Sequence, residues 1–110
     1  MENTNYISSI VQILEKPRKT ISEKNVMVTN VRAQLSEARN NKLPTLVRLI
    51  FWGKLSQAVL DYYQATDYLV VEGYVSIKNR QELESKSHFL KCIEITVLKI
   101  YPFLLSSKYS

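Results

Sequence analysis

The chain has 110 residues, of which 45% are hydrophobic and 23% are charged, and its formal net charge is +5. These values are typical of one folded domain, expected over residues 1–110, and they exclude a disordered polar chain. The single cysteine, Cys92, excludes an intramolecular disulfide and a zinc site built from several cysteines, and no apolar run approaches the roughly 20 residues of a membrane span.

The first third of the chain contains two segments with the composition of strands. Residues Tyr6–Leu14 are mostly apolar, and we expect this strand to end before Pro17, which has no backbone N–H to donate to a sheet. In Asn25–Leu35 apolar residues alternate with polar ones, which include Arg32. This pattern predicts a half-buried strand with a polar, partly basic outer face. The polar residues Ser36–Pro44 then predict a loop.

A third strand and a helix follow. In Leu46–Trp52 every second residue contributes to an apolar face that we expect to be buried, whereas Arg48 and Trp52 share the opposite face. Residues Leu55–Ala65 have apolar positions at the spacing i, i+3, i+4, i+7 and i+8. This spacing predicts a helix with one apolar stripe, suited to lying across the end of a sheet.

The last part of the chain contains two more predicted strands. Residues Tyr68–Lys78 alternate between two faces, and the charged residues Asn79–Ser87 predict a loop. The fifth strand is long, His88–Ile100, and we expect Tyr101-Pro102 to end it because proline lacks the N–H of a central strand.

Five strands with one short helix between the third and the fourth are the element order of the OB-fold, a small, partly open all-β barrel. The expected core covers about residues 6–100, and a tail at 101–110 follows. The chain has only two glycines, Gly53 and Gly73, and both lie at or near strand ends. We expect each to mark a bend or a close approach of two backbones.

Three motifs occur in a characteristic order along the chain. An aromatic-Gly-Lys-Leu corner lies within Phe51–Leu55, the helix contains the pair Tyr62-Tyr63, and the strand Val70–Val75 contains Glu-Gly. In this order and spacing they resemble the bacterial-type single-stranded DNA-binding protein family, and the resemblance extends roughly from Tyr6 to Ile100. In its short length and composition the chain most resembles the small members encoded in algal plastids and found in cyanobacteria. The resemblance therefore implies the plastid stroma or, otherwise, a bacterial-type cytoplasm.

This resemblance implies an OB-fold that binds single-stranded DNA without sequence preference and forms dimers or tetramers, partly through pairing of the first strand. Independently of any family, stacking tolerates every base because every base has a π-face, and it contributes about 1–3 kcal/mol per base. Lysine and arginine add affinity by releasing counterions from phosphates. The positive net charge is compatible with such a partner.

Trp52 is the leading candidate for base stacking, because the opposite face of its strand already supplies core residues. The alternative is a tryptophan that caps the barrel beside the helix. The fourth strand and its extension place a tyrosine and two basic residues on one face, which is either a binding face or an ordinary solvated one. On the fifth strand Lys91 and Lys99 share a face, and Lys91 is preferred. The candidate DNA-binding residues are Trp52, Arg48, Lys54, Tyr74, Lys78, Arg80, Phe89, Lys91 and Arg32.

No sequence pattern predicts catalysis, a metal or a cofactor. His88 has no partner at metal-ligand spacing, and Glu72 is not paired by pattern with a second carboxylate or a histidine. Two isolated glycines make no phosphate-binding loop. We therefore expect a non-enzymatic protein with no cofactor and no membrane partner.

A rival hypothesis is an OB-type interaction module that has kept the fold and lost DNA binding. The loss of tryptophan at two positions where the family frequently has it favours this hypothesis. One position is Leu46 in this chain, and the other aligns with about Arg80. Its partner surface would be the strand edge Ile7–Leu14 or the tail Tyr101–Leu105. The family's acidic C-terminal tail has no counterpart in the sequence, so we expect no recruitment through one. RNA is a third alternative, because stacking and charge do not read the 2′-OH.

Overall fold

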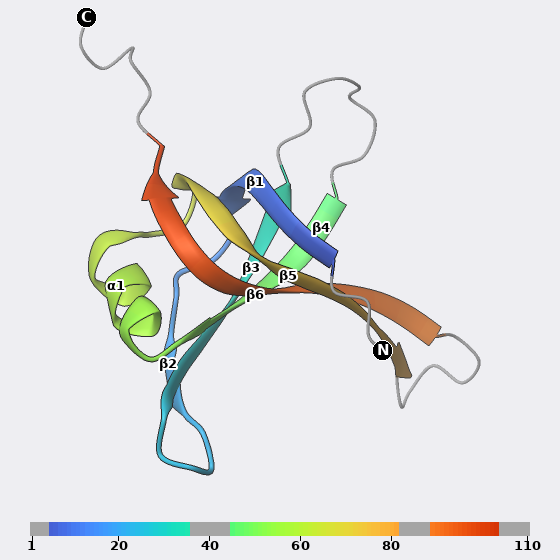
Figure 1. The fold of residues 1–110 in the computed structure, drawn as a ribbon, viewed down its shortest axis with the longest axis horizontal. Coiled ribbons are helices and arrows are strands. Elements are labelled where there is room, and N and C mark those ends of the chain that lie inside the picture. The colour runs from blue at the N-terminus through green and yellow to red at the C-terminus, as the bar shows by residue number, and fades with distance from the viewer. Residues whose placement is uncertain (1–4, 36–44, 82–88, 104–110) are drawn as a thin grey trace, which may run out of the picture.

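Six strands and one helix form the part of the protein that the computed structural model describes, residues 5–35, 45–81 and 89–103. Five of the strands curl into a ring, and the helix lies at one end of it (Figure 1). The elements are β1 (Asn5–Ile13), β2 (Lys19–Ile21), β3 (Met27–Leu35), β4 (Thr45–Trp52), α1 (Lys54–Tyr62), β5 (Tyr68–Gln81) and β6 (Phe89–Pro102).

The ring is closed by β1, which pairs with two different strands. Residues Asn5–Gln12 of β1 pair antiparallel with β5, and Val11–Ile13 also pair antiparallel with β3. The remaining order is β5-β6-β4-β3, in which β4 and β6 are parallel. The element order predicted from the sequence is therefore confirmed, with the helix between β4 and β5.

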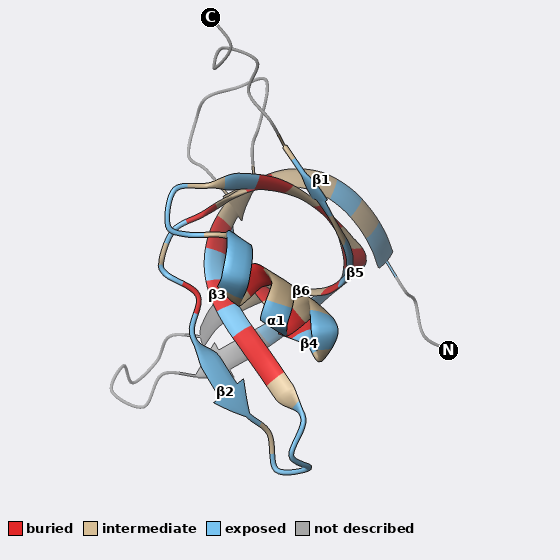
Figure 2. Ribbon diagram, turned by 90° about the vertical axis from the view of Figure 1, so that its left-hand side faces the viewer, coloured by how far each residue is buried: buried red, intermediate tan, exposed pale blue. Residues whose placement is uncertain are grey.

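The core fills the inside of the ring because alternate residues of each strand point inward. The largest inward side chains, among them Phe51, Leu49 and Ile95, are fully buried. Helix α1 adds Val59 to this core, and the hydroxyl of its Ser56 is hydrogen-bonded to that of Thr29 on β3. This polar contact is fully buried, so both hydroxyls are satisfied where water does not reach. In Figure 2 the buried segments recur along the strands of the ring.

The two glycines fulfil the two conformational roles expected of them. Gly53 joins β4 to α1 with φ +59°, a left-handed conformation, and its N–H donates a 2.9 Å hydrogen bond to the carbonyl of Met27. Gly73 lies at a close approach of β5 and β6, because a Cβ at this position would be 2.0 Å from the carbonyl oxygen of Thr96. The first glycine permits a turn, and the second permits strand pairing.

A β-bulge beside Gly73 corrects the predicted face of one lysine. Glu72 pairs with Lys99 but Gly73 pairs with Val97, so Leu98 is an additional residue on β6. Beyond the bulge the inward and outward positions exchange. Lys99 therefore lies on the face opposite to Val97, and the prediction that it shares a face with Lys91 is wrong because simple alternation does not anticipate a bulge.

The other differences concern element boundaries and one short strand. Strand β2 was not predicted because its three residues are all exposed and show no alternation; within the described ranges it pairs with β3 alone. Strands β5 and β6 continue past the ring as a two-stranded arm (Figure 1), which includes part of the predicted loop Asn79–Ser87. β6 ends at Pro102, which pairs with Leu69, whereas the predicted strand ended at Ile100. The helix ends at Tyr62 because Tyr63 is extended.

Candidate nucleic-acid interface

The outward side chains of four neighbouring strands form one continuous surface. Paired residues of a sheet lie on the same face, so the registers β3–β4, β4–β6 and β5–β6 define rows across this surface. One row is Arg32, Arg48, Glu94 and Ser76, and the next row is Asn30, Ile50, Thr96 and Tyr74. We call this surface the outer face; it also includes Val28, Trp52 and Lys78.

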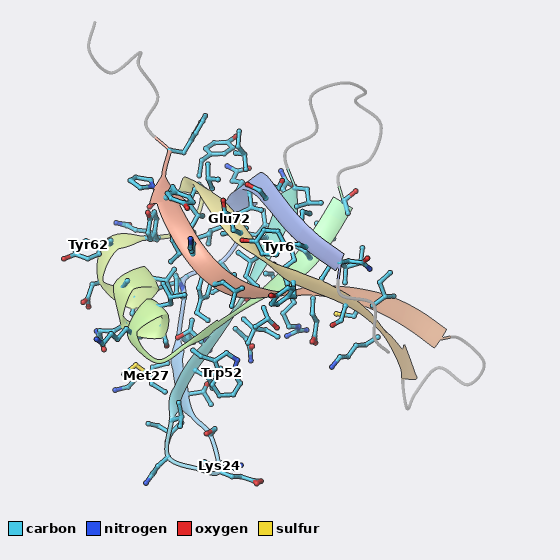
Figure 3. All side chains as sticks on the ribbon, in the orientation of Figure 1. Tyr6, Lys24, Met27, Trp52, Tyr62 and Glu72 are labelled. Atoms are coloured by element: carbon cyan, nitrogen blue, oxygen red, sulfur yellow. The ribbon has the colours of Figure 1, made fainter. Side chains whose placement is uncertain are left out.

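Trp52 occupies one end of the outer face. Its side chain is opposite in direction to that of the buried Phe51, and the residue is 45% exposed. Val28, its cross-strand partner on β3, is almost fully buried. In Figure 3 Trp52 points away from α1, and Met27 points to the helix side. The indole therefore lies beside a buried valine and remains accessible to a ligand. This position differs from that of a tryptophan that caps the barrel beside the helix.

The basic residues Arg32, Arg48 and Lys78 of the outer face have different surroundings. Arg32 is exposed, its backbone N–H donates to Glu15 Oε2 (3.0 Å), and its Nε lies 3.4 Å from Glu15 Oε1. Lys78 Nζ lies 3.5 Å from Glu94 Oε1. Arg48 is partly buried, and its Nε has no hydrogen-bond partner within the described part of the chain. Two of these cations are thus engaged by carboxylates, and the third has an unsatisfied donor.

Tyr74 lies on β5 in the row next to Trp52 and is 43% exposed. It lies against Tyr6 of β1, with ring centroids 5.5 Å apart and ring planes at 73°. The hydroxyl of Tyr6 donates a 2.9 Å hydrogen bond to Glu72 Oε1, and this bond is the main reason that the pKa of Tyr6 is raised. Figure 3 shows Tyr6 and Glu72 close to one another. The edge-to-face contact holds the Tyr74 ring in a defined orientation.

Four predicted site residues lie elsewhere or are partly outside the described structure. Lys54 is exposed at the first position of α1, two residues beyond Trp52 and across the turn at Gly53. The backbones of Arg80, Phe89 and Lys91 belong to the β5–β6 arm, where they pair with Leu90, Gln81 and Asn79. The side chains of these three residues are outside the described part of the protein. The outer face therefore brings together Arg32, Arg48, Trp52, Tyr74 and Lys78.

Three residues that shape this surface were not predicted from the sequence: Glu94, Glu15 and Tyr6. Glu94 shares a face of β6 with Cys92 and Thr96, opposite to the apolar face, so its outward direction could be predicted from the sequence. Its position between β4 and β5 could not be predicted, because the parallel pairing of β4 with β6 leaves no local signal in the sequence.

Other kinds of site are not indicated in the described ranges. The residues described include no cluster of histidine, cysteine, aspartate and glutamate suited to a metal ion. No helix within the same ranges is long and apolar enough to cross a membrane. A pocket of about 430 Å³ lies at the C-terminal end of α1 and contains no residue of the outer face; it is lined by Lys16, Leu60, Asp61, Tyr62, Tyr63, Gln64 and Ala65.

Comparison with known proteins points to one family. No family model matches the chain. A curated protein of Trieres chinensis, "Putative single-stranded DNA-binding protein ycf41", is 38% identical over 104 residues, which are 94% of this chain and 92% of that protein. The similarity therefore extends over nearly the full length of both chains.

Solved structures agree with this result. A small single-stranded DNA-binding protein from Streptomyces coelicolor has a TM-score of 0.80 at 12% identity, covering 94% of this chain and 97% of its own. The SSB domain of a Synechococcus protein has a TM-score of 0.68 at 22% identity, covering 92% and 98%. The second single-stranded DNA-binding protein of Mycobacterium smegmatis has 0.68 at 17% identity, covering 91% and 89%. These likenesses show that the fold is the OB-fold predicted from the sequence.

Proposed function

Because the chain belongs to the single-stranded DNA-binding protein family, whose members are non-enzymatic, we propose that it binds single-stranded DNA across the outer face without sequence preference. The observation that carries this proposal is the exposed indole of Trp52 on the same face as Arg32, Arg48 and Lys78. The resemblance to small plastid-encoded members leads us to propose the plastid as the location.

The proposed mechanism combines stacking on Trp52 and Tyr74 with neutralisation of phosphates by Arg32, Arg48 and Lys78, which lie in the rows beyond Tyr74. Trp52 and Tyr74 are separated by β6 and by two residues along the strand direction. With about 4.8 Å between strands and about 3.3 Å per residue, their Cα atoms are roughly 12 Å apart. One base does not reach both rings at this separation, so each ring would stack on a different base of one strand. Rings and cations read no base edges, which accounts for the absence of sequence preference.

Titration with oligo-dT tests the proposal, because Trp52 is the only tryptophan and reports directly on stacking. We expect its fluorescence to be quenched on binding. We also expect log K against log salt to fall with a slope of about −1.4 to −2, as two to three cations release counterions from single-stranded phosphates.

Two further measurements separate the alternatives. Unchanged fluorescence together with no salt-dependent binding would contradict the proposal. Protein partners retained in a pull-down from nuclease-treated extract would then favour the interaction module. Competition between oligo-dT and oligo-U compares DNA with RNA, and a clear preference for oligo-U would assign RNA as the ligand instead.

We also propose that the protein is a homo-oligomer formed partly through β1. Among the described residues, Asn5–Ile10 pair with β5 on one side and with no strand on the other. An open edge of this kind offers unpaired backbone groups to a second copy. Light scattering is expected to give the mass of a dimer or a tetramer, and the mass of a single chain would contradict this expectation.

A further inference from the structure

Glu94 is a carboxylate in the middle of the outer face, where a polyanion would lie. It belongs to the central strand β6 and is in register with Arg48 on one side and Ser76 on the other. Its side chain is only 17% exposed, so its position is fixed by its neighbours. One of its oxygens, Oε1, lies 3.5 Å from Lys78 Nζ. The negative charge is thus paired with one of the residues proposed to hold phosphates and is in register with another.

Arg48 brings a second cation to the strand beside Glu94. Its Nε is buried and has no hydrogen-bond partner in the described ranges, although a buried donor without a partner is costly. Arg48 is the neighbour of Glu94 across the parallel β4–β6 pair. A carboxylate and a phosphate present the same kind of charged oxygen acceptor to arginine and lysine. Lys78, which contacts Glu94, can therefore pair with either anion.

We propose that Glu94 is a built-in competitor of the DNA phosphate. It pairs with Lys78 in the free protein, and a bound phosphate must displace it and tolerate its charge nearby. This inference rests on the proposed function, because it concerns how tightly the same face binds single-stranded DNA. The consequence is an affinity lower than the number of cations on the face suggests, and a salt dependence reduced by the cation that Glu94 holds.

Glu94→Gln removes the charge and keeps the shape of the side chain. We expect it to tighten oligo-dT binding about tenfold at low salt, the gain that corresponds to one charge-assisted hydrogen bond. The slope of log K against log salt should become more negative by about 0.7, the value for one further phosphate contact. Anisotropy of a labelled oligo-dT at several salt concentrations measures both, with circular dichroism as the test of folding. Asp61→Asn on α1 makes the same change in net charge away from the outer face and should alter affinity less than about twofold.

A second variant keeps the inference testable if Glu94→Gln disturbs the strand. Lys78→Gln changes an exposed side chain and should weaken binding only about twofold in the native background, because Glu94 already occupies this lysine. In the Glu94→Gln background the same change should cost about tenfold, so the two effects are not additive.

The outcomes distinguish the two proposals. If the native protein binds oligo-dT and Glu94→Gln binds no better than Asp61→Asn, the role of Glu94 is overturned and the proposed function stands. A large loss on Lys78→Gln alone would overturn it as well. If neither the native protein nor Glu94→Gln binds, the proposed function itself is contradicted. Binding by Glu94→Gln alone would support the competitor role in its strongest form.

Discussion

Replacing Trp52 with alanine is expected to weaken binding of single-stranded DNA by about ten- to a hundred-fold. One stacked base contributes about 1–3 kcal/mol, and each 1.4 kcal/mol is a factor of ten. The effect should be large because Leu46 stands, on the same strand face, where the family frequently has another tryptophan. The variant has no tryptophan fluorescence, so the measurement is the anisotropy of a labelled oligo-dT.

Two matched variants identify stacking as the cause. Trp52→Phe keeps an aromatic face and should retain most of the affinity. Tyr62→Ala removes an exposed aromatic ring from α1, outside the outer face, and should leave binding unchanged. Equal losses for Trp52→Ala and Tyr62→Ala would mean that the DNA does not follow the outer face.

Gly73→Ala should lower the free energy of unfolding by about 3 kcal/mol, near the upper end of the cost of overpacking. The added methyl group would be 2.0 Å from the carbonyl oxygen of Thr96 and 3.0 Å from the Cα of Val97. Both atoms are backbone, so no side chain can rotate to make room. β5 and β6 would have to separate at the bulge, where their pairing determines which side chains point into the core. Urea denaturation followed by circular dichroism measures the change.

Gly53 provides the control for this effect. A Cβ at Gly53 meets no atom within 4 Å, but its φ of +59° is unfavourable for other residues. Its ψ of −124° puts it outside the left-handed helical region that asparagine tolerates. Gly53→Ala should therefore cost about 2 kcal/mol, from backbone strain alone. A cost for Gly73→Ala no larger than that for Gly53→Ala would mean that β5 and β6 can separate easily.

The strands of the ring were predictable from the sequence because each has one buried face. In β4, for example, alternation correctly separated Phe51 from Trp52, and the spacing of apolar residues located α1. These signals are local, and burial on one side imposes them. The arm includes residues 79–81, which belong to the charged segment that predicted a loop, so no alternation identified them as part of a strand.

The composition of the outer face was only partly predictable, because it depends on which strands become neighbours. Alternation placed Arg48 and Tyr74 on outward faces, but no local pattern brings them together with Glu94. The ion pair between Lys78 and Glu94 joins β5 and β6. The register of these two strands includes a bulge, which alternation does not predict. Long-range register is set by the whole ring, whereas alternation is a property of one strand.

The position of β6 also has a consequence for the order in which the protein is made. β6 is the last of the described strands, yet it lies between β5 and β4 in the ring. Until it emerges from the ribosome, the order β5-β1-β3-β4 can form only an open sheet, whose apolar inner face has no complete cover. Native closure must therefore wait until β6 has been synthesised, and the exposed inner face favours aggregation during that interval.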